Sequence, residues 1–134
     1  YIFMGKKDYQ QLFLIKKHIE KNKIKTFVIS CNTIRENKFL PYSSRNFNLN
    51  KHDKVLAIKV YKLLRKEKKF IKKNKIQKIN FSNIKKKILK FGIKKIDYIE
   101  AINLNNFKKA KKFNENFNIF SAFYVNKIRL IDNF

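Results

Sequence analysis

The chain is poor in several residues whose abundance would mark a particular class of protein. Its 134 residues include one cysteine, one proline, two glycines and no tryptophan. The single cysteine, Cys31, excludes an internal disulfide framework and is typical of a reducing compartment. No apolar run is long enough to span a bilayer. We therefore expect a cytoplasmic protein with no membrane partner.

Acidic residues are also scarce, and the formal net charge is +25. Such a charge could indicate a basic nucleic-acid-binding module, because cations that neutralise phosphates release counterions. The basic residues are spread along nearly the whole chain, however, and arginine supplies only four of the 34. Lysine, isoleucine, asparagine and phenylalanine, whose codons are rich in A and T, make up 80 of the 134 residues. We favour this compositional explanation and expect no specific nucleic-acid partner, with the nucleic-acid module as the alternative.

The first third of the chain has the pattern of an α/β unit. Apolar spacing predicts a helix over residues 10–23, and a β-branched, aromatic run predicts a buried strand over 26–31. Residues 32–50 have the composition of a loop. The start, Ile2 to Met4, resembles the middle of a buried strand, so we expect the chain to be a fragment of a longer protein.

The rest of the chain predicts two helices and then three short strands. Asn50 is the expected N-cap of a helix over 51–73, and a second helix should run from a cap at Ser82 to a stop at Gly92. The residues of this second helix expected to point inward are Ile84, Ile88 and Leu89. Strands are expected over 96–100, 117–125 and 128–131, the last two joined by a tight turn at Asn126 and Lys127. The lysine-rich stretch 66–78 comes nearest to a linker. We place a domain boundary near residue 46, between the α/β unit and a small α+β domain.

One polar segment has the chemistry of a phosphate-binding loop. Ser43, Ser44 and Arg45 offer two hydroxyls and a planar fork of donors that suits phosphate oxygens. The same residues also occur in ordinary polar turns.

A second segment, Gly5 to Gln11, lies between the strand-like start and the first helix. Open α/β folds bind ligands at such strand-to-helix turns, and glycine permits close approach of a ligand to the backbone. Lys7 could reach a phosphate, Asp8 could accept from ribose hydroxyls, and Gln11 could bind a polar substrate. The alternative is a solvated loop in which Asp8 caps the helix.

Together these motifs resemble those of one family, the pantothenate synthetases. The family's G-E-K-D-[FY]-Q-Q motif corresponds to residues 5–11, its P-[TI]-x-R-E/A motif to 32–36, and its D-G-L-A-[ML]-S-S-R-N motif to 38–46, with matching spacing. Residues 96–100 resemble a Val-Asp-Tyr-Val-Glu pattern, and a closing R-L-I-D-N is intact at 129–133. The resemblance covers nearly the whole chain.

The resemblance implies an AMP-forming ligase of pantothenate biosynthesis, on the coenzyme A pathway. Such enzymes use ATP to convert pantoate into pantoyl adenylate with release of pyrophosphate, and the amine of β-alanine then displaces AMP. Residues 1–46 would be the C-terminal end of a Rossmann-like nucleotidyl-transferase domain that binds ATP and pantoate. Residues 47–134 would be a small α+β C-terminal domain. Full-length members usually form homodimers.

The resemblance also implies residue roles. Gly5 and Asp8 would lie at the ribose of ATP, Gln11 would hold pantoate, and the backbone of Ile34 would contact adenine. The predicted catalytic residues, which would act on the phosphates, are Lys7, Ser43, Ser44 and Arg45. The predicted ATP-binding residues are Gly5, Lys6, Lys7, Asp8, Ile34, Tyr42, Ser43, Ser44 and Arg45.

The sequence departs from the family pattern in the motifs themselves and in extent. Lys6 replaces a glutamate, Pro41 replaces a small residue, and Lys38 and Phe39 replace Asp-Gly. Loss of this glycine puts the backbone path of the loop in question, because phenylalanine does not readily adopt φ > 0.

The family's H-x-G-H motif and its acidic metal ligands have no counterpart here. We expect them, and Mg²⁺, in a missing N-terminal half, without which the chain would be inactive. His18, His52 and Cys31 are interpreted as surface or packing residues, and no metal site is predicted. A decayed fragment is a third hypothesis, against which the intact segments 43–46 and 129–133 argue.

Overall fold

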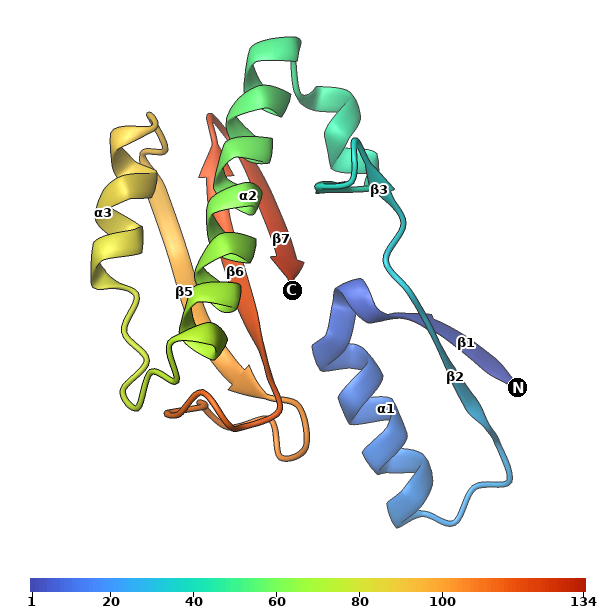
Figure 1. Cartoon of the computed structure of the whole chain (residues 1–134). Helices are drawn as coiled ribbons and strands as arrows, with labels where there is room; N and C mark the ends of the chain where they lie inside the picture. Colours follow the sequence, from blue (N-terminus) through green and yellow to red (C-terminus); the bar gives the residue numbers. More distant parts are fainter. The chain divides into compact units, whose positions relative to one another are not determined.

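The computed structural model describes all residues, 1–134, which form two compact units, Tyr1–Ile34 and Arg35–Phe134. The first unit is a β-α-β arrangement (Figure 1). Strand β1 (Ile2–Gly5) leads through the 3-10 turn η1 (Lys6–Asp8) into helix α1 (Tyr9–Lys21), and β2 (Val28–Cys31) returns parallel to β1. Because Gly5 pairs with Cys31, the segments that follow both strands leave from the same edge of this small sheet.

The strands of the first unit are less buried than we expect from their sequence. Ile2 and Phe3 are 41% and 68% exposed, so the prediction of a buried strand at the start is wrong for this structure. The sheet has only two strands, and α1 is the only helix of the unit, buried chiefly through Leu12. The second strand begins at Val28 rather than at residue 26, because Thr26 donates to the Ile24 carbonyl in a turn.

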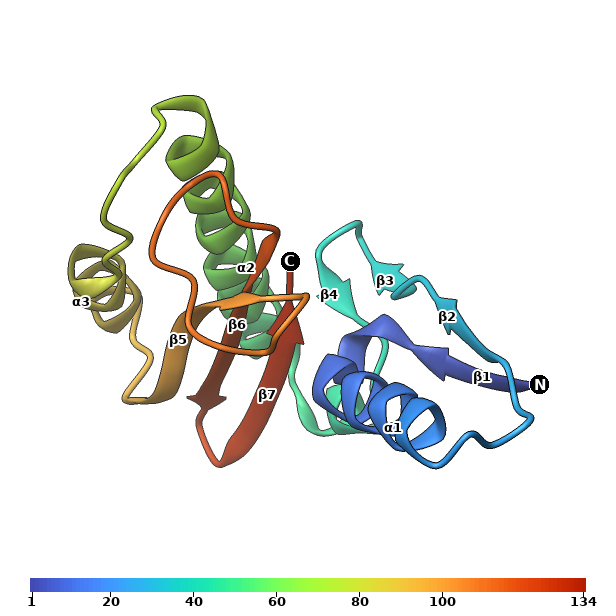
Figure 2. The same ribbon diagram turned by 90° about the horizontal axis from the view of Figure 1, so that it is seen from below.

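The second unit packs two helices on one face of an antiparallel sheet (Figure 2). The sheet has the order β5-β6-β7, with β6 paired to both neighbours. The segment predicted as a loop, 32–50, instead contains a short hairpin and a 3-10 helix. The elements are β3 (Arg35–Glu36), β4 (Leu40–Pro41), η2 (Ser44–Asn48), α2 (Lys51–Lys73), α3 (Ser82–Lys90), β5 (Lys95–Asn103), β6 (Phe117–Val125) and β7 (Ile128–Asn133).

The core of the second unit follows from two periodicities. Helix α2 buries Val60, Tyr61 and Leu64 on one stripe, at the three- and four-residue spacing of a helix face. Strand β6 buries alternate residues such as Phe117 and Phe123 on the face toward α2. The main hydrophobic cluster, which runs from Leu40 to Leu130 in the sequence, lies entirely within this unit.

Most predicted elements of the second unit are confirmed, including the bounds of α2 and β6. Asn50 caps α2, since its Oδ1 accepts from the backbone N–H of Asp53 at 2.8 Å. Asn126, between β6 and β7, adopts φ 53°, as a tight turn requires. Strands β5 and β7 extend beyond the predicted ranges because their pairing with β6 continues.

Two predictions around α3 are wrong. The N-cap position is Phe81, and Ser82 is already helical, with its N–H and hydroxyl bonded to Asn80 Oδ1. Leu89 is 48% exposed because it lies off the stripe formed by Ile84 and Ile88. Of the lysine-rich stretch 66–78, residues 66–73 form the last part of α2, as the predicted bounds of that helix require. None of the helices combines the length and apolar composition needed to cross a membrane.

Candidate functional site

In the first unit, the predicted ligand-binding residues gather at the carboxyl edge of the β1–β2 sheet. Lys6 follows β1 and donates from Nζ to Oδ1 of Asn32, which follows β2, at 2.8 Å. This bond ties together the two turns at that edge. Ile34, the residue predicted to lie at adenine, is 73% exposed at the end of the second turn.

Gly5 and Asp8 both leave room for a ligand. Gly5 has an extended backbone (φ −71°, ψ 135°), so glycine is not required there for its conformational freedom. A Cβ at this position would meet nothing within 4 Å, so the space beside the backbone is open. Asp8 occupies the N-cap position of α1, yet its side chain makes no capping hydrogen bond. Its exposed carboxylate is therefore not used as a cap, and Gln11 is likewise exposed on α1.

In the second unit, the hairpin β3–β4 forms without the glycine typical of the family motif. The left-handed conformations fall on Asn37 (φ 47°) and Lys38 (φ 63°), whereas Phe39 does not adopt positive φ. The N–H of Phe39 donates to the Glu36 carbonyl at 3.0 Å, and its ring lies beneath the ammonium of Lys62 at 4.9 Å. Phe39 therefore fits the hairpin without backbone strain.

The residues with phosphate-binding chemistry follow directly after β4. Ser43 caps η2, with its Oγ accepting from the Arg45 backbone N–H at 3.3 Å. Ser44 and Arg45 are exposed, and Tyr42 is 61% exposed. The guanidinium of Arg45 forms no ion pair within the chain, so its donors remain directed to solvent or to a ligand.

The buried side chain of Asn46 fixes the end of this loop to the hairpin. Its side chain is 3% exposed, and its Nδ2 donates to Oε1 of Glu36 and to the carbonyl of Pro41, each at 2.9 Å. The other carboxylate oxygen of Glu36 accepts from Lys54 Nζ of α2 at 3.3 Å. The loop between Pro41 and Asn46 is thus closed by side-chain bonds at its base.

A buried ion pair fastens the hairpin to the last strand of the sheet. The guanidinium of Arg35 donates to both carboxylate oxygens of Asp132 in β7, with Nη2–Oδ1 at 3.0 Å. It also donates to the carbonyls of Phe39 at 2.8 Å and Asn133 at 3.3 Å. The exposed fractions of the two side chains are 11% and 0%. The roles of these supporting residues were not predicted from the sequence, although Arg35, Glu36, Asn46 and Asp132 all lie within the recognised motifs.

The two histidines and the cysteine are surface residues. His18 and His52 are exposed on α1 and α2, and Cys31 is exposed at the end of β2. Nowhere in residues 1–134 do three or more His, Cys, Asp or Glu side chains form a group that could hold a metal ion.

Comparisons with known proteins agree over the full chain. The profile of the family described as pantoate-beta-alanine ligase matches residues 1–134. The pantothenate synthetase of Francisella tularensis subsp. mediasiatica is 40% identical over 136 residues, covering 99% of this chain and 42% of that protein. The pantothenate synthetase of subsp. novicida is 39% identical with the same coverage.

Solved structures give the same result. The pantoate-beta-alanine ligase of Francisella tularensis, complexed with beta-gamma ATP and beta-alanine, matches with a TM-score of 0.69 and 39% identity over 98% of this chain and 42% of that one. The pantothenate synthetase of Thermus thermophilus has a TM-score of 0.74 at 21% identity, covers 98% of this chain and 48% of that one, and shows the shared mixed α/β fold. The chain spans about two fifths of the length of the curated relatives. On this evidence, the chain belongs to the pantoate-beta-alanine ligase family.

Proposed function

We propose that this chain supplies part of an enzyme that joins pantoate to β-alanine with ATP through pantoyl adenylate. The observation that carries the proposal is the family match over residues 1–134, which includes both predicted ligand-binding segments. A relative that is 39% identical was solved with beta-gamma ATP and beta-alanine, which supports ATP and β-alanine as ligands. Because the chain spans 42% of its relatives, we propose that a further segment completes the active site.

The proposed chemistry needs charge neutralisation and positioning rather than a protein nucleophile. A carboxylate oxygen of pantoate attacks the α-phosphorus of ATP, and the bond to the departing pyrophosphate breaks. The amine of β-alanine then attacks the acyl carbonyl, loses a proton, and AMP leaves. In this scheme Arg45 binds phosphate oxygens through its fork of donors, the hydroxyls of Ser43 and Ser44 add hydrogen bonds, and Lys7 contributes a point charge.

The remaining predicted residues would orient the substrates. Gly5 offers open backbone and Asp8 an uncapped carboxylate, which supports the proposed contacts with ribose. We propose Gln11 for pantoate and the backbone of Ile34 for adenine, with Tyr42 beside the phosphates. The ammonium of Lys6 bonds to Asn32, so its proposed part is to order the turn that approaches ATP.

Other features of the full enzyme are proposed from the family. The side chains of this chain do not fit an Mg²⁺ site, because no three His, Cys, Asp or Glu side chains lie close enough together to hold a metal ion. We therefore place the Mg²⁺ ligands and the H-x-G-H motif outside residues 1–134. We propose that 1–46 complete a Rossmann-like domain for ATP and pantoate, and that 47–134 form the α+β C-terminal domain. The parallel β-α-β order of the first unit supports this assignment. The whole enzyme would be a cytoplasmic homodimer.

Pyrophosphate release tests the proposed function. The chain alone, given ATP and pantoate, should release none, and addition of a polypeptide that carries the H-x-G-H half of a relative should restore release. In the reassembled enzyme, Arg45→Ala should lower the rate about a hundredfold, as expected for loss of one donor to a developing charge. Lys21→Ala, at the exposed end of α1, is the matched control. Turnover by the chain alone would contradict the proposed division of the site, and full activity of Arg45→Ala would contradict the role of the loop.

A further inference from the structure

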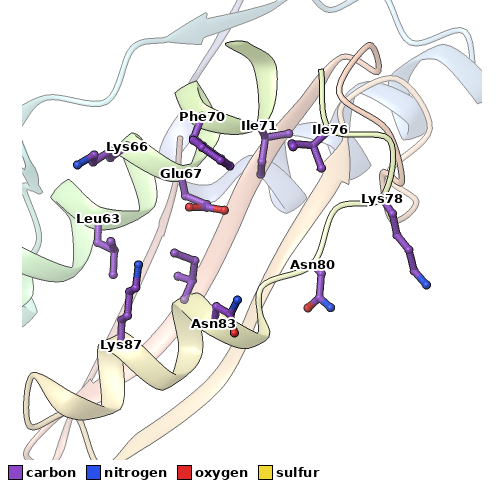
Figure 3. Close-up of a pocket in the computed structure, with 11 residues that line it drawn as sticks. Leu63, Lys66, Glu67, Phe70, Ile71, Ile76, Lys78, Asn80, Asn83 and Lys87 are labelled. Atoms are coloured by element: carbon purple, nitrogen blue, oxygen red, sulfur yellow. The ribbon is translucent and has the colours of Figure 1, made fainter. Parts of the chain in front are cut away.

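A hollow lies between α2 and α3, closed on one side by the segment that links them (Figure 3). Its volume is about 420 Å³, within the range of roughly 300–1,000 Å³ typical of small-molecule sites. All of its lining residues belong to the second unit. None of them is among the residues proposed to bind ATP or pantoate.

The floor of the hollow is apolar. Ile71 of α2 and Ile84 of α3 both line it, and they are 2% and 4% exposed. Leu63 and Ile76 extend the floor, and the ring of Phe70 forms an edge that is 51% exposed. An apolar group of a ligand placed on this floor would leave water without displacing any core side chain.

The rim is polar and mainly cationic. Lys66, Lys78 and Lys87 come from α2, the linking segment and α3, and none of the three forms an ion pair in the structure. Lys87 and the carboxylate of Glu67 both extend into the space between the helices (Figure 3). Asn80 and Asn83 add side-chain amides. Three lysines and one glutamate thus line the hollow, and of the three lysines it is Lys87 whose side chain extends into the space beside Glu67.

We infer that this hollow binds a small amphiphilic anion, in which an apolar chain or ring ends in an acid group. The apolar part would cover the floor between Ile71 and Ile84, and the acid group would pair with Lys87, with the Asn83 amide as a further polar partner. The ligand should be an anion because the lysines outnumber the glutamate around the hollow and the chain has a net charge of +25, both of which repel a cation.

Glu67 gives this site a dependence on pH. Partial burial raises the pKa of the Glu67 carboxyl above its ordinary value of 4.5, and the charge of Lys87 opposes the shift. The other charged groups that line the hollow are Lys66 on α2, Lys78 on the linking segment and Lys87 on α3. An anion bound nearby favours protonated Glu67, so binding should strengthen as the pH falls through the raised pKa of Glu67.

The test is a titration of the ¹⁵N-labelled whole chain with hexane-1-sulfonate, a probe that stays ionised throughout. We expect saturable shifts at the amides of Asn83 and Ile84, about tenfold weaker binding of hexan-1-amine, and no saturation with methanesulfonate. Lys87→Gln should weaken sulfonate binding about fivefold, the upper range for an exposed ion pair. Lys90→Gln, exposed on the same helix and outside the hollow, should change nothing. Glu67→Gln should abolish the pH dependence and bind at neutral pH as tightly as the parent does at low pH.

Several results would overturn the inference. These are the absence of saturable shifts, binding of the amine as tight as that of the sulfonate, and equal weakening by Lys87→Gln and Lys90→Gln. The last result would show attraction to the overall charge rather than to the rim. Because the measurement requires no catalysis, failure here leaves the proposed ligase function untouched, and loss of that function leaves this site untouched.

Discussion

Single residues outside the Tyr42–Arg45 loop fasten the hairpin that precedes it. The ion pair between Arg35 and Asp132 joins residues 97 positions apart and is almost fully removed from water. Buried charges of this kind are tolerated only as a pair, because each alone would lack the solvation that it loses on folding. The pair therefore couples the hairpin before the loop to the last strand of the sheet.

Removal of one partner of this pair should be costly. We expect Arg35→Ala or Asp132→Ala to lower the free energy of unfolding by about 3–5 kcal/mol, since each leaves an uncompensated buried charge. The double variant Arg35→Met/Asp132→Leu should lose less than the sum of the two. Urea denaturation followed by circular dichroism measures all three. Lys109→Ala, which breaks the exposed pair with Glu100, is the control and should leave the midpoint in place. Additive losses would contradict the coupling.

Tyr61 offers the opposite case, a buried polar group without a partner. Its side chain is fully buried, and its hydroxyl has no hydrogen-bond partner. Burial, and next the charge of Asp132, raise the pKa of Tyr61 well above its ordinary value, so the hydroxyl stays neutral. Tyr61→Phe keeps the ring contacts with Phe123 and Phe134 and should raise the free energy of unfolding by about 1 kcal/mol. A lower unfolding temperature in calorimetry would contradict this interpretation.

At the scale of elements, the two glycines of the chain have different roles. Gly92 follows α3 with φ +100°, a conformation that strains any residue with a side chain, whereas Gly5 at the end of β1 has φ −71°. Gly92→Ala should therefore lower the free energy of unfolding by at least about 1 kcal/mol, and Gly5→Ala should leave it unchanged. In the reassembled enzyme, Gly5→Ala should have the larger effect on ATP binding. It should raise KM for ATP because the new methyl group enters the space proposed for ribose. Equal losses of stability in Gly92→Ala and Gly5→Ala would contradict these different roles.

The sequence predicts best those elements that local chemistry determines. Helix α2 has a capping asparagine at Asn50 and an apolar stripe with helical spacing, so its bounds agree with the prediction. The strands β3 and β4 have two residues each and depend on Arg35, whose partner lies in β7. No local pattern indicates such a pairing, so residues 32–50 resemble a loop. The residues proposed to bind ATP were recognised from short contiguous motifs, just as α2 was recognised from its local sequence. The roles of the residues that support them became apparent only in the structure.

Burial was predicted least well where a segment lacks neighbours. The apolar residues of β1 and β2 indicate a sheet interior, yet Phe3 and Phe27 are 68% and 70% exposed. The apolar side chains of these strands suit a buried sheet, whereas their exposed fractions depend on which neighbours are present in this chain.

At the scale of the whole molecule, the apolar core lies almost entirely in residues 35–134. Every residue of the main hydrophobic cluster belongs to this unit, whereas Leu12 is the one fully buried apolar residue of the first unit. A two-stranded sheet with one helix is marginal in water, because it buries too little apolar surface to offset chain entropy. The two units should therefore differ greatly in stability, although both contain residues proposed to bind ATP.

Hydrogen exchange on the intact chain tests this difference. Amides of α2 and β6 should exchange only through global unfolding, whereas those of β1 and β2 should exchange through local opening at a much lower free energy. Residues 35–134 expressed alone should unfold cooperatively at nearly the urea midpoint of the whole chain, and residues 1–34 alone should lack fixed structure. Equal protection in both units would show that the first is stabilised by contacts beyond its own sheet and helix. In the reassembled enzyme, ATP should raise the protection of residues 5–11 and of the Ser43–Arg45 loop, since each segment is proposed to bind ATP.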